Sequence, residues 1–472
     1  MKHIYLAVDL GATSGRTVVG ELENGMLSQR ELTRFANPII QVAGHYFWDI
    51  FALYGELIKA LKQCAEQHIE IESIGIDTWG VDVVCFDAHG LPLRNPYSYR
   101  DPHTTQSVTD GLFAKVPKWQ VYETTGIQFM NINTLFQLEA MLEAQDGVLQ
   151  MADKILFIPD ALTYMLTGTA VCESTILSTS QLLNPRTKQI DETLLNAVRV
   201  QQRQMGRRVE PGTIVGTLSD EVRQLTGLGA IPVVAVAGHD TASAVAAVPA
   251  RDESYAYLSC GTWSLLGIEL QAPIINQQSY DLNFTNEGGV FGTTRFLKNI
   301  CGLWIFERCR AEWQDAPQQV AQLVSAAAAA PSCGTKIDPD DPMFANPVSM
   351  VSAINDYCAQ HHLVAPQGYA QTARCIFESL AAKYKEVVDM LRMFAPFEIR
   401  QLHVIGGGSQ NAFLMQLAAD ELQMPVVTGP VEGTAMGNLM MQAVAAGVCG
   451  NLKEMREVVG RSTQVHTYMP QR

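Results

Sequence analysis

Residues 4–16 read IYLAVDLGATSGR, an apolar run that stops at Asp9 and continues into a turn of small residues. A β-rich pattern resumes after this turn, and it ends at Asn24-Gly25, a pair that is typical of tight hairpin turns. A third β-rich run follows the pair. The N-terminal stretch therefore predicts antiparallel strands whose first turn is rich in glycine and hydroxyl residues.

A helix and another strand are expected next. Asp49 is placed to cap a helix, because apolar residues recur behind it at intervals of three and four. These residues are Ile50, Leu53, Tyr54, Leu57, Leu61 and Ala65. The strand expected at residues 73–76 runs into Asp77-Thr78-Trp79-Gly80. The first unit of the chain thus has the order hairpin, helix, strand.

The second half of the chain repeats this order. A strand at residues 255–258 runs into the small residues SCGTWS, and a helix at 373–393 precedes a strand that ends in three glycines. Two units of the same order predict an α/β fold that arose by internal duplication. We place the join just after the His239-Asp240 turn, which gives domains at 1–246 and 247–460.

Composition narrows the class of protein. The 472 residues are 47% apolar and carry a formal net charge of −15. An acidic chain disfavours nucleic acid and anionic membranes as partners, because phosphate backbones are bound by clustered Lys and Arg. The most apolar stretch, residues 231–250, holds His239 and Asp240 at its centre and reads as a buried strand with a turn. Without a secretory signal or a CxxC pair, we expect a cytoplasmic enzyme or binding protein.

The first turn carries groups that suit a phosphate. The glycines at 11 and 15 permit a tight bend, and the intervening Ala12, Thr13 and Ser14 offer free amides and hydroxyls. Arg16 adds a cation, and Asp9 adds a carboxylate suited to magnesium. The spacing matches neither the P-loop nor the dinucleotide fingerprint, and alone it favours an ordinary hairpin. A second turn of this kind, at Gly261-Thr262, strengthens the phosphate interpretation.

The triple glycine at 406–408 follows a strand and precedes a helix expected to start near Ser409 or Asn411. One or two glycines there would fit a helix entry with an unusual backbone angle. Three in succession favour close approach of the backbone to a ligand such as a nucleotide.

Asp240 follows the strand expected at 232–237, in the sequence Gly-His-Asp-Thr. A carboxylate at such a strand end is suited to act as a general base on a hydroxyl. The simpler interpretation is that Asp240 caps the next helix, and the proposed domain join favours the base. The segment from Asp77 to Asp82 combines tryptophan with carboxylates, as sugar sites do, and a solvated hairpin is an equal alternative.

Together these motifs resemble the FGGY carbohydrate kinases of the actin-like ATPase superfamily, over nearly the whole chain. The resemblance includes segments at 8–16, 73–82 (SIGIDTWGVD), 99–101, 126–129, 133–135, 159–160, 166–168, 239–245 (HDTASAV), 259–265, 285–289 (TNEGG), 297–300 (LKNI), 302–304 and 406–408. It implies two similar actin-like, or ribonuclease H-like, domains with a deep interdomain cleft.

The SIGIDTWGVD, TNEGG and LKNI segments resemble those members that phosphorylate L-rhamnulose at its 1-hydroxyl with ATP and Mg²⁺. The resemblance implies Asp240 as catalytic base, with Gly80, His239, Thr241 and Asn299 contacting the ketose. It implies that ATP contacts Ala12, Thr13, Ser14, Gly15, Arg16, Thr262 and Gly407, with magnesium near Asp9. Glu307 stands where the family often has Gln at the nucleotide. The resemblance also implies a disulfide between Cys358 and Cys375, which a reducing cytosol disfavours.

The expected partners are therefore a small ketose and ATP, in a monomer or homodimer. Two alternatives stay open. One is another ketose kinase of the family, such as an L-fuculokinase, with the same machinery and a different pocket. The other is a non-catalytic actin-like ATPase, against which the carboxylate at 240 and the acids at 77–82 argue.

Overall fold

The computed structural model describes residues 1–471, which form two compact units. Unit 1 comprises Met1–Ala247, Leu270–Phe296 and Thr434–Ser462. Unit 2 comprises Val248–Glu269, Leu297–Gly433 and the residues from Thr463 onward. Two segments of the second half of the sequence thus belong to unit 1.

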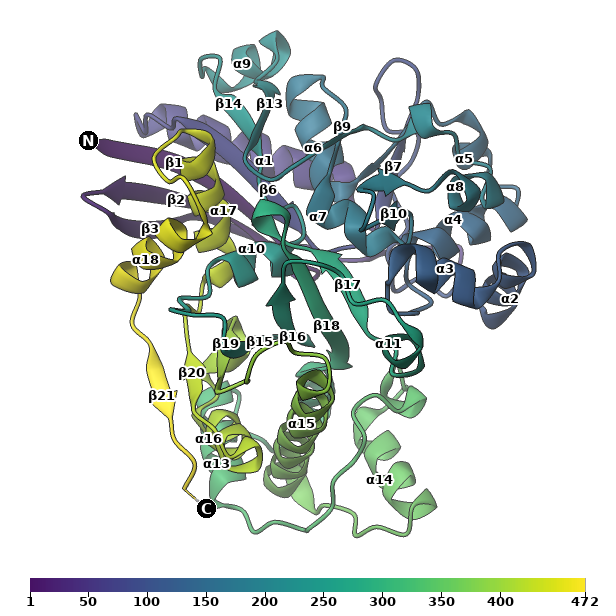
Figure 1. Cartoon of the computed structure of the whole chain (residues 1–472), viewed down its shortest axis with the longest axis vertical. Helices are drawn as coiled ribbons and strands as arrows, with labels where there is room; N and C mark the ends of the chain where they lie inside the picture. The colour runs from purple at the N-terminus through teal and green to yellow at the C-terminus, as the bar shows by residue number, and fades with distance from the viewer. Residues whose placement is uncertain (472) are drawn as a thin grey trace. The chain divides into compact units, whose positions relative to one another are not determined.

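Unit 1 is built on a six-stranded mixed sheet of order β13-β14-β6-β1-β2-β3 (Figure 1). These strands are β1 (Lys2–Leu10), β2 (Ser14–Glu23), β3 (Met26–Ala36), β6 (Ser73–Thr78), β13 (Thr213–Thr217) and β14 (Pro232–Ala235). Short strands are β4 (Ile40–Val42), β5 (His45–Phe47), β7 (Val83–Phe86), β8 (Lys154–Phe157), β9 (Val171–Glu173), β10 (Leu183–Asn184), β11 (Gln189–Ile190), β12 (Arg207–Val209) and β17 (Thr285–Gly288). The predicted hairpin is confirmed: β1 pairs antiparallel with β2, and β2 with β3. Asn24 and Gly25 have φ of 51° and 71°, as a tight hairpin turn requires.

The helices of unit 1 include the one predicted behind Asp49, whose side chain accepts a hydrogen bond from the Ala52 amide. They are α1 (Ile50–Glu66), α2 (Gln106–Lys115), α3 (Lys118–Thr125), α4 (Thr134–Glu143), α5 (Gly147–Met151), α6 (Ile158–Thr167), α7 (Ser174–Leu177), α8 (Glu192–Ala197), α9 (Asp220–Thr226), α10 (Asp240–Ala246), α11 (Gln277–Asp281), α17 (Gly433–Ala445) and α18 (Leu452–Ser462). The predicted strand at 232–237 ends two residues early, at Ala235.

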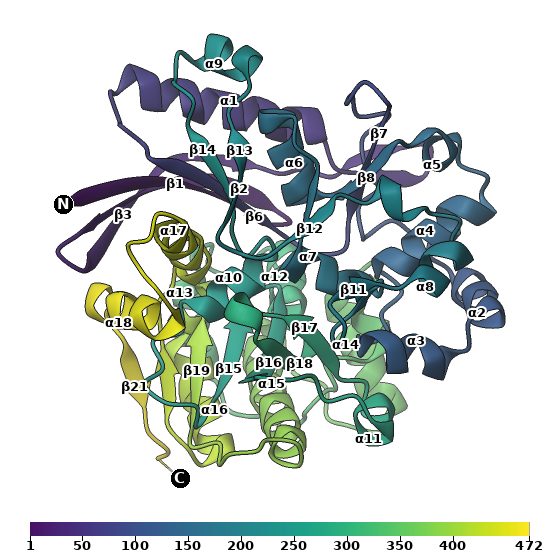
Figure 2. The same ribbon diagram turned by 45° about the horizontal axis from the view of Figure 1, so that its top comes forward.

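Alternation along β1 places apolar side chains on both faces of the sheet. Leu6, Val8 and Leu10 belong to a core that includes residues of α1 and α6. Tyr5 and Ala7 belong to a second core with residues of α10, α17 and α18. Figure 2 shows α1 and α6 on one side of these strands and α17 on the other. A strand that is buried on both faces explains the continuous apolar run before Asp9.

The helices α17 and α18 complete unit 1 from the far end of the sequence. Gln442 on α17 donates from Nε2 to the Leu6 carbonyl at 3.0 Å and accepts from the Ser73 hydroxyl at 2.7 Å. Asn438, one turn earlier, donates from Nδ2 to the Asp77 carboxylate at 2.6 Å. Buried polar side chains of α17 thus satisfy polar groups of β1 and β6.

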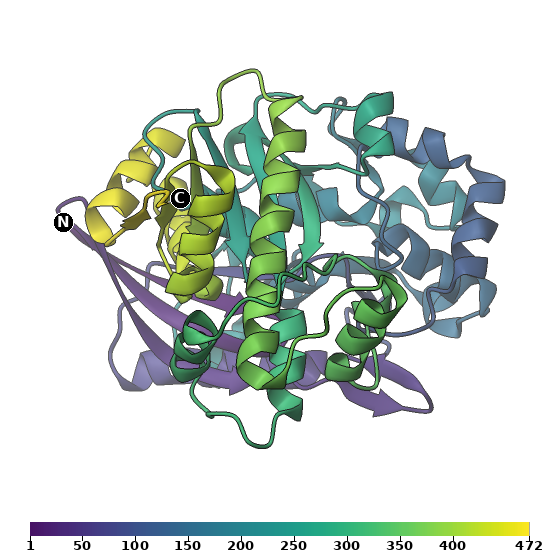
Figure 3. The same ribbon diagram turned by 90° about the horizontal axis from the view of Figure 1, so that it is seen from below.

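Unit 2 is built on strands of order β18-β16-β15-β19-β20-β21, and β18 begins in unit 1 beside β17. The strands are β15 (Tyr255–Cys260), β16 (Trp263–Leu270), β18 (Thr294–Cys301), β19 (Gln401–Ile405), β20 (Val426–Thr428) and β21 (His466–Tyr468). The helices are α12 (Trp304–Glu312), α13 (Val320–Ala329), α14 (Met350–Gln360), α15 (Gly368–Arg392) and α16 (Ala412–Leu422). Figure 3 shows α15, the longest helix, beside α16.

The predicted repeat of one order of elements in both halves is confirmed by strand topology. In unit 1, β1 pairs antiparallel with β2 and parallel with β6, and β14 lies parallel to β6 on its far side. In unit 2, β15 pairs antiparallel with β16 and parallel with β19, and β20 lies parallel to β19 on its far side. An antiparallel strand, β13 or β21, ends both orders. The glycine-bearing turns therefore follow corresponding strands.

The cysteine and membrane expectations can be compared with the structure. Cys358 and Cys375 are both free, buried thiols, so the disulfide implied by the resemblance is not formed. Burial is also the main reason that the pKa of the Cys375 thiol is raised. Among residues 1–471, no helix combines the length and apolarity needed to cross a membrane.

Candidate active site

Asp240 begins α10 at the end of the parallel strands of unit 1. The Thr78 amide donates to the Gly238 carbonyl at 2.9 Å, which brings the end of β6 beside the turn before α10. His239 is the N-cap of α10, and Asp240 is its first helical residue. The alternative in which Asp240 caps the helix is therefore wrong, although its Oδ1 does accept from the Thr241 amide at 2.5 Å.

One oxygen of Asp240 makes all the contacts that the structure records for its carboxylate. Oδ1 accepts from the amide and hydroxyl of Thr241, and it lies 3.5 Å from Nε2 of His239. The side chain remains 30% exposed. Burial nevertheless raises the pKa of Asp240, and His239 and Thr241 oppose that rise. These contacts fix the orientation of the carboxylate through Oδ1, and the exposed part of the side chain can accept a hydrogen bond from a hydroxyl.

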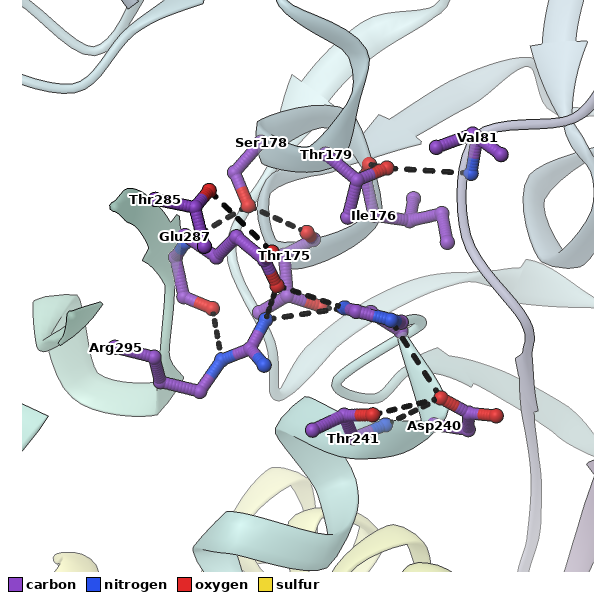
Figure 4. Close-up of polar contacts among 12 residues, drawn as sticks. Val81, Thr175, Ile176, Ser178, Thr179, Asp240, Thr241, Thr285, Glu287 and Arg295 are labelled. Carbon is purple, nitrogen blue, oxygen red and sulfur yellow. Dashed lines mark hydrogen bonds and ion pairs between the residues drawn. The ribbon is translucent and has the colours of Figure 1, made fainter. Parts of the chain in front are cut away.

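Gly80 and His239, predicted to contact the ketose, lie beside one another in unit 1. A Cβ at position 80 would lie 3.5 Å from His239 Nε2 and 3.3 Å from the Thr179 hydroxyl. Thr179 also contacts the Val81 amide at 3.3 Å, as Figure 4 shows. Val81 has φ of 70°, a strained value for a β-branched residue. Because Gly80 has no side chain, no Cβ stands between its backbone and Nε2 of the His239 ring.

Asp82 is not a sugar ligand in this structure. Its Oδ2 accepts from Trp48 Nε1 at 2.6 Å, Trp79 Nε1 at 2.9 Å and the Tyr99 amide at 3.1 Å, while Oδ1 accepts from Gln137. Burial raises the pKa of Asp82 to about 6 despite these four bonds. Both interpretations of the Asp82 carboxylate, sugar ligand or solvated hairpin, are therefore wrong. It instead organises the segment that carries Gly80.

The first turn of unit 1 brings a carboxylate and a guanidinium together. Arg16 donates from Nε and Nη2 to Oδ2 of Asp9 at 2.9 and 2.7 Å. Asp9 is paired in register with Asp77 on β6. Burial, and then the Asp9 carboxylate, raise the pKa of Asp77 well above its ordinary value. Oδ1 of Asp77 is buried and has no hydrogen-bond partner among residues 1–471.

Backbone bonds and the side chain of Asn37 hold this turn in place. The Gly11 amide donates to the Ser14 carbonyl at 2.9 Å, and Asn37 bonds the carbonyls of Gly11 and Thr13. Ala12, Thr13 and Ser14 are at least partly exposed. A Cβ on Gly15 would lie 2.4 Å from the Phe35 ring, so that glycine is required by packing.

The corresponding turns of unit 2 meet at the end of β15. The amides of Gly302 and Trp304 donate to the Thr262 carbonyl at 3.1 and 3.2 Å. A Cβ on Gly408 would lie 2.3 Å from Cys260 Sγ, and one on Gly406 would lie 3.0 Å from the Cys260 carbonyl oxygen. Only Gly407 of the three has open space where its Cβ would stand. Packing thus explains two of the glycines, and the third presents its backbone to open space.

The remaining predicted residues also lie in unit 2. Asn299 is half-buried on β18. Glu307 lies in the first turn of α12 and pairs with Arg310 at 2.5 Å. Asn411 caps α16 through its side chain, and the helix begins at Ala412, one residue beyond the predicted start.

The groups present fit the expected cofactors in kind. Open space at Gly407 and the partly exposed residues 12–14 suit phosphate oxygens. No cluster of three metal-ligating side chains occurs within the described chain. Magnesium typically binds one or two carboxylates and completes its shell with phosphate and water, and Asp9 with Asp77 supplies such oxygens.

Sequence reasoning missed a buried charged pair behind His239. Glu287 on β17 lies 3.0 Å from Nη2 of Arg295 on β18, and the Arg295 side chain is fully buried. Figure 4 shows these two side chains pointing toward each other. Glu287 lies in the TNEGG segment noted above, whereas Arg295 stands in no motif. The signal that the sequence offers for Arg295 is a charged residue directly before the apolar pair Phe296-Leu297.

Comparisons with known proteins support this description. Residues 4–247 match the N-terminal domain of the FGGY family of carbohydrate kinases, and residues 256–446 match its C-terminal domain. A protein of Bacteroides thetaiotaomicron called rhamnulokinase is 51% identical over 471 residues, covering 100% of this chain and 96% of that protein. A rhamnulokinase of Bacillus subtilis is 42% identical, covering 99% of this chain and 95% of that protein.

Solved structures share the fold at low identity. A ligand-bound xylulose kinase from Lactobacillus acidophilus aligns with a TM-score of 0.79 at 17% identity, covering 99% of this chain and 94% of that one. A glycerol kinase from Plasmodium falciparum with ADP aligns with a TM-score of 0.78 at 16% identity over the same shares. With both domain models matched and full-length relatives above 40% identity, the chain belongs to the FGGY family of carbohydrate kinases.

Proposed function

We propose that this chain transfers the terminal phosphoryl group of ATP to the 1-hydroxyl of L-rhamnulose. Relatives called rhamnulokinase, at 41–51% identity over nearly the whole chain, support the choice of substrate. The observation that carries the chemistry is Asp240, a carboxylate fixed through one oxygen and 30% exposed. The products are L-rhamnulose 1-phosphate and ADP.

Asp240 acts as the general base. The sugar hydroxyl donates its proton to the carboxylate as its oxygen attacks the terminal phosphorus in line, and ADP leaves with the bridging oxygen. The proton then passes from Asp240 to solvent when the product departs. Burial raises the pKa of Asp240, which strengthens the carboxylate as a proton acceptor.

The ketose is oriented from the same side of unit 1. Nε2 of His239 lies on the side of the ring that faces Gly80, and Asp240 lies next to His239. The hydroxyl and amide of Thr241 hold Oδ1 of Asp240, so Thr241 acts on the sugar mainly by fixing the base. Asn299 is assigned to the ketose by its motif.

ATP is assigned to residues of both units. Thr262 and Gly407 belong to the turns that meet at Cys260, and residues 12–16 form the first turn of unit 1. Glu307 is held by Arg310, which offsets the charge that the carboxylate would otherwise present to the nucleotide. Magnesium, when bound near Asp9, supplies charge neutralisation for the phosphates.

A ketose panel tests the proposal. ADP release is measured with L-rhamnulose, L-fuculose, D-xylulose and D-fructose, each at several concentrations, with a sugar-free reaction as the baseline. We expect the highest kcat/KM with L-rhamnulose and a low baseline. A clear preference for L-fuculose or another ketose would overturn the substrate assignment, and equal ATP turnover without sugar would overturn the kinase assignment.

A further inference from the structure

The ion pair between Glu287 and Arg295 is buried deep in unit 1. Their side chains are 5% and 0% exposed, and Nη2 lies 3.0 Å from Oε2. Arg295 also donates from Nε to the Gly288 carbonyl at 2.9 Å. Burial opposes ionisation of Glu287, but the Arg295 guanidinium favours it, and the pKa of the carboxyl is lowered. The pair is therefore charged.

Such a pair contributes little to stability by itself. Removing two charges from water costs several kcal/mol each, and the mutual attraction often repays no more than that cost. Moreover, Nη1 of Arg295 is buried and finds no hydrogen-bond partner anywhere in residues 1–471. Since buried polar groups are nearly always satisfied, this site calls for a reason other than folding.

His239 supplies that reason, because the guanidinium and the carboxylate both lie close to Nδ1 of its ring. Nη2 of Arg295 lies 3.1 Å from Nδ1 of His239 with hydrogen-bond geometry, and Oε2 of Glu287 lies 3.3 Å from the same atom. The other ring nitrogen, Nε2, lies 3.5 Å from Oδ1 of Asp240. Figure 4 draws the resulting line of contacts from Glu287 and Arg295 to Asp240.

The chemistry of the guanidinium fixes the tautomer of the ring. Arginine has five donors and no acceptor, so a hydrogen bond between Nη2 and Nδ1 requires Nδ1 to accept. A neutral imidazole that accepts at Nδ1 carries its proton on Nε2. Nε2–H then faces the space beside Gly80, next to the carboxylate of Asp240.

We propose that Arg295, anchored by Glu287, is a positioning residue that holds His239 as the neutral Nε2–H tautomer, so that the ring donates to a sugar oxygen beside the base. The identity of that ligand rests on the proposed function, whereas the tautomer does not. A neutral donor orients the ketose without placing a second positive charge against Asp240. A ring with the opposite tautomer would present a lone pair to the carboxylate and to the sugar.

The tautomer is read directly by NMR of protein labelled with ¹⁵N-histidine. His239→Gln identifies the resonances of that ring among the ten histidines. In the wild-type protein we expect an unprotonated Nδ1 and a protonated Nε2. Arg295→Gln removes the cation and shortens the side chain, so Glu287 is left to attract a proton to Nδ1 and the signals should move to the other tautomer. Arg295→Lys keeps a donor-only cation and should preserve the wild-type pattern.

Kinetics supply a second readout. With Arg295→Gln we expect at least a tenfold rise in KM for the ketose and a KM for ATP within twofold of wild type, with substantial recovery in Arg295→Lys. Lys115→Gln is the matched control, because Lys115 pairs with Glu139, another buried carboxylate of unit 1, at 2.5 Å. It should change neither the His239 signals nor the ketose KM.

The outcomes are separable. A proton on Nδ1 in the wild-type protein, or signals and ketose KM that Arg295→Gln leaves unchanged, would overturn the inference. If Arg295→Gln does not fold, the wild-type and Arg295→Lys spectra still decide the tautomer. If the wild-type protein shows no sugar-stimulated ADP release, the proposed function fails, while the spectra still test the role of Arg295 toward His239.

Discussion

The first turn of unit 1 and the first turn of unit 2 follow corresponding strands of two sheets with the same topology, yet they carry different groups. On β1, Asp9 lies in register with Asp77 on one side and with Arg16 on the other. On β15, Ser259 lies in register with Ile405 and Leu265. The same backbone frame therefore holds charges in one unit and uncharged side chains in the other.

The residues at the strand ends differ between the units in the same way. In unit 1 the acids at 9, 77 and 240 accumulate at the strand ends, and burial raises the pKa values of the latter two. In unit 2, Gly406 and Gly408 pack closely against Cys260, and Gly407 has open space where a Cβ would stand. Unit 1 thus has carboxylates at its strand ends, whereas unit 2 has glycine backbone at the corresponding place.

The strongest test of this division is Asp240→Asn. Loss of the general base should lower kcat by about 10²–10⁴-fold, or about 3–5 kcal/mol, with nucleotide affinity unchanged. Steady-state ADP release and nucleotide titration measure the two effects. Asp220→Asn is the control, because Asp220 also begins a helix of seven residues in unit 1 but is 87% exposed. Near-normal turnover in Asp240→Asn would remove the base from unit 1.

The next test concerns unit 2. Gly407→Val places a side chain in the open space at that position, and we expect nucleotide affinity to fall by about 10–100-fold, or about 1.4–3 kcal/mol. Calorimetric titration with ATP measures it. Gly408→Ala should instead lower Tm, because its Cβ would meet Cys260 Sγ at 2.3 Å. A folded Gly407→Val with wild-type affinity would contradict the role given to unit 2.

Gly80→Ala tests the sugar side of unit 1. The added methyl group would lie 3.3 Å from the Thr179 hydroxyl and 3.5 Å from His239 Nε2, so the fold should tolerate it while the ketose loses space. We expect a rise in ketose KM of about fivefold, or about 1 kcal/mol, with unchanged KM for ATP. Gly55→Ala in α1, where nothing lies within 4 Å of the new Cβ, is the matched control. Equal KM values in both variants would place the sugar elsewhere.

The last test, of stability rather than of activity, is Asp77→Asn, measured as Tm against pH without magnesium. Burial and Asp9 raise the pKa of the folded Asp77, whereas an unfolded Asp titrates near about 4. The wild-type protein therefore loses stability as pH rises from about 4 toward the folded pKa, and the isosteric amide does not. The Tm of the variant should therefore exceed that of the wild type by a margin that grows as pH rises. The corresponding stability difference should lie within the range of about 0.5–3 kcal/mol typical of single substitutions. Asp110→Asn, at an exposed position, is the control, and its curve of Tm against pH should run parallel to that of the wild type. A parallel curve for Asp77→Asn would show that the pKa of Asp77 is not raised.

Local sequence was informative where the signal is local. The Asn24-Gly25 turn, the Asp49 cap and the order of elements in both units follow from neighbouring residues, and the structure confirms them. The contacts of Asp82 were not predictable, because its four donors come from residues 34, 3, 17 and 55 positions away. A carboxylate read alone gives no sign of such partners.

The same limit applies to the site. Sequence placed Gly80, His239 and Asp240 near strand ends, and the structure brings them together. It could not separate Gly407 from its two neighbours, because the difference depends on Cys260, almost 150 residues away. Arg295 was missed for a similar reason, since its partners Glu287 and His239 are identified only by the packing of distant segments.

The attachment of α17 and α18 to unit 1 has a consequence for synthesis on the ribosome. Gln442 and Asn438 satisfy groups of β1 and β6 that are translated first, but they emerge only after residues 297–433 of unit 2 have been made. The part of the unit 1 sheet that α17 covers therefore stays uncovered until the polypeptide is almost finished. Unit 1 therefore cannot be completed on the ribosome before residues 297–433 of unit 2 have been synthesised.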